Sequence, residues 1–184
     1  MRLVLEAAFP SHRWQFDRAF AVGVRKRPDA KVVEGDRVII VEVDEHSHRL
    51  YGCDKERERE RIFVHHASKK QVVVMCRFNP DKYTTDDGKR IPSCFRVSGE
   101  KGLVSLNPKR TADWDRRCNN LVHWVRSFLD PTCGHYVEHV PEPEPGRPLF
   151  SEELFYDTPM TEAAKRATTD AYARAAKRQK VTSA

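Results

Sequence analysis

The chain contains 184 residues with a formal net charge of +6 at pH 7; 39% of the residues are hydrophobic and 33% are charged. This composition predicts one folded domain with an appendage, and the positive charge favours a polyanionic partner, nucleic acid first. No secretory signal and no run near the ~18 apolar residues that cross a bilayer is visible, so we expect neither a secreted nor a membrane protein. Five scattered cysteines without a C-x-x-C pair predict reduced thiols in an intracellular protein.

The chain begins with a predicted short helix followed by a strand. Residues 2–9 are mostly apolar, include Glu6, and fit either a helix or a strand that Pro10 ends. Residues 14–20 are rich in aromatic side chains and predict the first strand of a sheet, which carries Asp17. We expect both acidic residues at outer positions of a site.

The next two predicted strands form a hairpin. Residues 29–33 and 37–44 are separated by a tight turn at Gly35, a length and composition that favour antiparallel pairing. The apolar β-branched run in residues 38–41 is typical of a strand that is buried on both faces.

Carboxylates gather at the end of this third strand. Alternation puts Glu42 and Asp44 on one face of the strand and Val41 and Val43 on the other. A buried carboxylate is costly unless it is paired or bound to a cation. If the two strands pair, Asp29 converges with Glu42 and Asp44 on one hard cation, which prefers oxygen ligands. The strand end therefore predicts a site for Mg²⁺ or Mn²⁺.

The remaining elements complete an alternation of helices and strands. Residues 52–67 predict a helix whose run of alternating charges, Arg59 included, is typical of a solvated face. Residues 71–78 predict the fourth strand, and residues 82–105 predict a loop or a small hairpin. Residues 111–129 carry an apolar stripe at helical spacing and predict an amphipathic helix.

The composition changes after residue 140. Alternating Pro and Glu predict an extended linker over residues 141–150, which separates a folded domain at 1–140 from a basic tail at 151–184. Two basic clusters in the tail fit a bipartite nuclear-localisation signal, which implies a nuclear-import receptor as a partner. The alternative is a generic basic tail that grips nucleic acid. The clusters contain Lys165, Arg166, Lys177, Arg178 and Lys180.

Several motifs together resemble the PD-(D/E)xK, or restriction-endonuclease-like, nuclease superfamily, and its very-short-patch-repair-like branch most closely. Arg27-Pro28-Asp29 precedes Glu42-Val43-Asp44, and His48 follows at a similar spacing. The wider run, which ends in Arg77-Phe78-Asn79-Pro80-Asp81-Lys82-Tyr83, is similar to a nuclease-like group encoded by large DNA viruses and protists. The similarity covers about residues 1–130.

The resemblance implies an α/β fold, with a mixed four-stranded sheet flanked by helices, and a DNA endonuclease of the nicking, repair or junction type. Asp29 and Glu42 would hold Mg²⁺ or Mn²⁺, and Asp44 would be a third ligand or would orient His48. Asp44 stands where the superfamily has a lysine, whose role would pass to His48 as general base or water-positioner. Expected phosphate contacts are Arg27, Arg59, Arg77, Asn79 and Lys82, with Glu6, Asp17 and Glu56 further out.

Two other functions fit the same residues. A nuclease-derived DNA-binding protein without activity, associated with a viral genome, is supported by Asp44 in the lysine position. A homing-type endonuclease would differ by cutting at a specific sequence. If the tail is a nuclear-localisation signal, the protein works in a eukaryotic nucleus, that of the host if the chain is viral. The oligomeric state stays open, although a double-strand break needs a dimer or two separate cuts.

Overall fold

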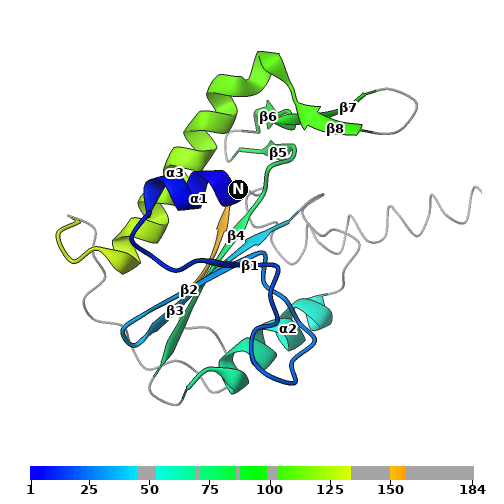
Figure 1. The fold of residues 1–184 in the computed structure, drawn as a ribbon. Helices are drawn as coiled ribbons and strands as arrows, with labels where there is room; N and C mark the ends of the chain where they lie inside the picture. Colours follow the sequence, from blue (N-terminus) through cyan, green and yellow to red (C-terminus); the bar gives the residue numbers. More distant parts are fainter. Residues whose placement is uncertain (45–52, 69–70, 86–87, 99–102, 134–149, 156–184) are drawn as a thin grey trace, which may run out of the picture.

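The computed structural model describes residues 1–44, 53–68, 71–85, 88–98, 103–133 and 150–155, with the backbone alone for 53–57, 98 and 150–153 (Figure 1). A five-stranded sheet with the order β1-β2-β3-β4-β9 lies at its centre. The first three strands pair antiparallel, whereas β3–β4 and β4–β9 pair parallel. The mixed α/β class expected from the sequence is thereby confirmed. The strands are β1 (Gln15–Phe16), β2 (Ala30–Glu34), β3 (Arg37–Val43), β4 (Val72–Phe78) and β9 (Phe150–Leu154).

The fifth strand corrects the expected sheet of four strands and the expected domain boundary. Residues 150–154, assigned from sequence to the linker and the tail, pair along β4 from Val74↔Phe150 to Phe78↔Leu154. Beyond the strand, the Phe155 ring packs against the Phe78 ring, with 5.9 Å between the two ring centroids. Short segments after a Pro-rich stretch carry too little periodicity to reveal that they pair with a distant strand. The folded domain therefore includes residues 150–155.

The β2–β3 hairpin forms as its turn predicts. Gly35 has a φ of +57°, a left-handed conformation that glycine adopts without strain. The register pairs Ala30 with Val41, which puts the preceding Asp29 level with Glu42. The parallel register of β3 and β4 pairs Glu42 with Arg77. The hairpin thus brings the charged residues of three strands into one row.

Helices cover both faces of the sheet (Figure 1). Helices α1 (Arg2–Ala8) and α3 (Thr111–Leu129) lie on one face, and α2 (Cys53–His66) lies on the other. The helices expected over residues 52–67 and 111–129 are confirmed to within one residue, and residues 2–9, which fitted either a helix or a strand, form a helix. The first strand, expected over residues 14–20, is limited to Gln15–Phe16. On the α1/α3 face the core contains Leu5, Ile39, Val41, Leu121 and Val125. On the α2 face it contains Phe20, Val38, Ile40, Phe63 and Met75.

Where a loop or one small hairpin was expected over residues 82–105, the structure has two pairs of short antiparallel strands. β5 (Tyr83–Thr84) pairs with β6 (Arg90–Ile91), and β7 (Phe95–Ser98) pairs with β8 (Leu103–Leu106). A short 3₁₀ helix, η2 (Pro108–Arg110), then leads into α3.

Arg117 anchors this segment to α3. Its guanidinium is fully buried and donates to the carbonyls of Asn79, Asp81 and Pro92 and to the Asp113 carboxylate.

Within the described part of the chain, no helix is long and apolar enough to cross a membrane. The cysteines whose side chains are described carry free thiols: Cys76, Cys94, Cys118 and Cys133.

Candidate metal centre at the end of β3

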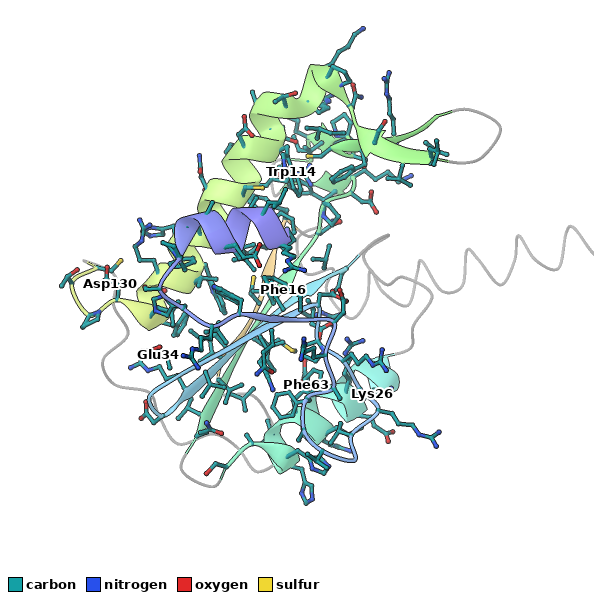
Figure 2. The ribbon with its side chains drawn as sticks, viewed as in Figure 1. Phe16, Lys26, Glu34, Phe63, Trp114 and Asp130 are labelled. Atoms are coloured by element: carbon teal, nitrogen blue, oxygen red, sulfur yellow. The ribbon has the colours of Figure 1, made fainter. Side chains whose placement is uncertain are left out.

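The charged row lies on the α2 face of the sheet, at the end where β3 and β4 finish. Glu42 alternates with Ile40, which packs in the α2-side core, while Val41 and Val43 pack on the opposite side. This confirms the two faces expected from the period of the strand. Phe63 of α2 lies below the sheet near the loop that carries Lys26 (Figure 2).

Glu42 is the most perturbed carboxyl of the row. It is 4% exposed, and its Oε2 accepts a hydrogen bond of 2.5 Å from Arg59 Nη2. Its buried Oε1 has no hydrogen-bond partner among the residues that the structure describes. Burial raises the pKa of Glu42 to about 8, with Asp29 and Asp44 adding to the rise and Arg59 opposing it. A buried carboxylate with one unsatisfied oxygen is costly unless a cation reaches it.

Asp29 faces Glu42 across the β2–β3 hairpin. Its Oδ2 accepts a 2.6 Å hydrogen bond from the Val43 amide, which fixes the carboxylate at the end of β3. Burial raises the pKa of Asp29, and the charges of Asp17 and Asp44 add to that rise. Two carboxylates therefore share one partly buried position, an arrangement that disfavours ionising both without a cation.

Asp44 is held differently from the other two carboxylates. It is 1% exposed, and its Oδ2 accepts a 2.6 Å hydrogen bond from Arg77 Nε. Its backbone amide donates to the Phe78 carbonyl at 2.9 Å, which extends the parallel pairing by one residue. Asp44 is thus engaged through Oδ2 in an internal ion pair with the neighbouring strand, and its expected role as a third ligand or as the residue that orients His48 stays a prediction.

The residues of this strand end fit a small divalent cation held by two carboxylates. Nowhere among the described residues do three or more His, Cys, Asp or Glu side chains gather as a metal-binding group. Mg²⁺ is usually bound through only one or two carboxylates and keeps several waters. Asp29 and Glu42 supply that number, and the unpartnered Oε1 of Glu42 supplies a free ligand atom.

Arg59 is the positively charged partner of Glu42 in this structure. Its Nη2 also donates to the Arg27 carbonyl at 2.9 Å, and its guanidinium lies 5.7 Å from the Phe63 ring centroid. Its buried Nε has no hydrogen-bond partner on any described residue. Sequence reasoning named Arg59 as a phosphate contact but missed its bond to Glu42. The available signal was its four-residue spacing from Phe63, which puts both on the helix side that meets the sheet.

Two of the expected phosphate contacts lie inside the protein. Arg77 is 9% exposed and pairs with Asp44. Asn79 is fully buried, and its amide donates to the Phe155 carbonyl and accepts from the Asp81 amide. The phosphate-binding role expected for Asn79 is therefore corrected, because both ends of its amide are used to hold the loop. Arg27 and Lys82 are exposed and accessible to a polyanion.

Of the acidic residues expected at outer positions of the site, one lies near Asp29 and another lies on the far side of the sheet. Asp17 lies close enough to Asp29 to raise its pKa, as an outer position requires. Glu6 does not occupy an outer position of the site. It lies on α1, across the sheet from Glu42, and its Oε1 pairs with Arg2 Nε at 3.0 Å. His48, the Glu56 side chain and the basic clusters of the tail lie outside the described residues.

Comparisons with protein-family models, with curated proteins and with solved structures gave no match.

Proposed function

We propose that this protein is a metal-dependent DNA endonuclease of the restriction-endonuclease-like class, which hydrolyses phosphodiester bonds with Mg²⁺ or Mn²⁺. The observation that carries the proposal is Glu42, a buried carboxyl with one unpartnered oxygen, placed level with Asp29. Its ion pair with Arg59 uses Oε2 and leaves Oε1 as a ligand atom. The motif resemblance and the net charge of +6 support DNA as the substrate.

Asp29 and Glu42 would hold the cation, because their oxygens are the ones that the strand end offers. The bound cation would polarise the scissile phosphate and lower the pKa of a water molecule. Arg59, released from Glu42, would move its guanidinium onto a phosphate oxygen, for which its planar fork is suited. The Asp44–Arg77 ion pair would hold β3 and β4 in register beneath the site. His48 is proposed as general base from the motif spacing.

The test is nicking of supercoiled plasmid DNA in Mg²⁺, in Mn²⁺ and in EDTA. We expect metal-dependent nicking by the wild type and its loss in Glu42→Gln, which removes the ligand charge while keeping the shape of the side chain. Glu34→Gln is the matched control, because Glu34 is exposed at the opposite end of the β2–β3 hairpin (Figure 2). Nicking that persists in Glu42→Gln would contradict the proposal.

The second candidate is a nuclease-derived DNA-binding protein without activity. It is favoured by Asp44, which stands where the motif has a lysine and is bonded to Arg77. It is also favoured by Arg59, which already occupies Oε2 of Glu42. Tight DNA binding with no cleavage in any metal would select this alternative. The homing-type endonuclease gains no support from the described residues.

A further inference from the structure

A groove opens beside the candidate metal centre, on the other face of the sheet. Val43 forms one wall of this groove. It stands in the chain between Glu42 and Asp44, but its side chain lies on the opposite face of the sheet from theirs. Its other walls come from the start of α1, from the loop after β4, from β7 and β8, and from α3. The residues lining it are Met1, Val43, Pro80, Asp81, Phe95, Arg96, Val97, Val104 and Trp114.

One face of the β7–β8 hairpin continues the groove outward. The register pairs Phe95 with Leu106 and Val97 with Val104, so these four residues share a face. Phe95 anchors the inner end, with its ring 5.0 Å from that of Trp114. Val97 and Val104 are 71% and 67% exposed. The hairpin therefore presents an apolar surface that the described residues leave exposed.

The charge of the segment that carries this surface indicates what covers it. From residue 88 to residue 110, the residues that the structure describes include five basic ones and no acidic one, a net charge of +5 against +6 for the whole chain. A concentration of this sign favours a polyanion. An apolar face on a basic segment is complementary to nucleic acid, whose bases have apolar flat faces and whose phosphate backbone is negative. The described basic residues are Lys89, Arg90, Arg96, Lys109 and Arg110, of which Arg96 lines the groove together with the acidic Asp81.

We propose that the groove and the apolar face of the β7–β8 hairpin bind an unstacked base of DNA, so that the substrate is DNA with an unpaired base. The inference rests on the proposed function for the choice of DNA. The end of β3 joins the two sites, with Glu42 facing the α2 side and Val43 the groove. A strand crossing this end of the sheet would place a phosphate near Asp29 and Glu42 and a neighbouring base against Val97 and Val104.

The experiment compares the affinities of the full chain for a fully paired DNA duplex and for the same duplex with one unpaired base. Fluorescence anisotropy in EDTA keeps the DNA uncut. We expect the wild type to bind the unpaired base roughly tenfold more tightly, the equilibrium equivalent of one stacking contact. Equal affinity of the wild type for the two duplexes would overturn the inference without reference to any variant.

The double variant Val97→Ser, Val104→Ser locates the contact. Both side chains are exposed, so we expect the fold to persist, the affinity for paired DNA to stay unchanged and the preference for the unpaired base to vanish. Val33→Ser is the matched control, because Val33 is exposed near the opposite end of the sheet. A preference that survives in the double variant would overturn the assignment to this hairpin.

The outcome is separable from that of the proposed function. A protein that nicks plasmid in Mg²⁺ but binds both duplexes equally would overturn this inference alone. A protein that prefers the unpaired base but never cuts would overturn the nuclease and leave the base site standing. Failure to bind either duplex would overturn both.

Discussion

At the scale of single residues, Glu42 is the residue that most strongly indicates a metal site. It combines burial, an unpartnered oxygen and proximity to a second carboxylate. The sequence predicts this residue well, because a glutamate inside an apolar β-branched run has few structural explanations. Arg59 is harder to predict, because a run of alternating charges does not show which member faces the sheet.

The raised pKa of Glu42 predicts how stability depends on pH. The folded protein holds this proton up to about pH 8, whereas the ordinary pKa of the carboxyl is 4.5. Between these values the folded state binds more protons than the unfolded state, so the free energy of unfolding falls as pH rises. We expect urea unfolding of the metal-free protein to show this decrease and Glu42→Gln to reduce its slope. An unchanged slope would contradict the buried, proton-binding carboxyl.

Arg59 and the cation compete for Glu42. We expect Arg59→Met to bind Mn²⁺ more tightly than the wild type, because the competing guanidinium is gone, yet to nick DNA about 10²-fold more slowly, since a charge that stabilises the phosphate is lost. The control is Arg61→Met, an exposed position on the same helix. Unaltered nicking in Arg59→Met would show that the guanidinium serves structure alone.

At the scale of elements, the period-2 and period-3.6 patterns located three strands (β2, β3 and β4) and two helices (α2 and α3) close to their observed bounds, whereas the first strand is much shorter than expected. They failed where contacts between distant segments decide the structure. The loop after β4 is an example: its Asn79 looks like a polar residue at a strand end, but its amide is enclosed by Asp81 and Phe155. A partner 76 residues away in sequence leaves no local signal.

We expect substitutions of Asn79 and Lys82 in this loop to have different effects: loss of Asn79 lowers stability, whereas loss of Lys82 weakens DNA binding. Asn79→Ala removes two buried hydrogen bonds and should lower the free energy of unfolding by about 1–3 kcal/mol. Lys82→Ala leaves stability unchanged but weakens DNA binding at low salt and reduces the salt dependence by about one counterion. Urea unfolding and salt-dependent anisotropy on both variants check this. A DNA-binding loss confined to Asn79→Ala would restore Asn79 as a phosphate contact.

At the scale of the whole molecule, β9 determines where the folded domain ends. A chain ending at residue 140 would lack β9, leave β4 as an unpaired edge and lose the contact of Phe155 with Phe78. We expect it to be less stable than a chain ending at residue 160 by roughly 3 kcal/mol or more, the cost of removing one packed aromatic residue. Equal stability in urea would show that residues 150–155 are dispensable.

The central claim is that Asp29 and Glu42 form a divalent-cation site, and Mn²⁺ binding followed by electron paramagnetic resonance tests it most directly. We predict one Mn²⁺ bound per chain by the wild type and by Glu34→Gln, displaced by excess Mg²⁺, with binding lost in Asp29→Asn and in Glu42→Gln. Equal Mn²⁺ binding by all four proteins, or binding by none of them, would contradict the claim.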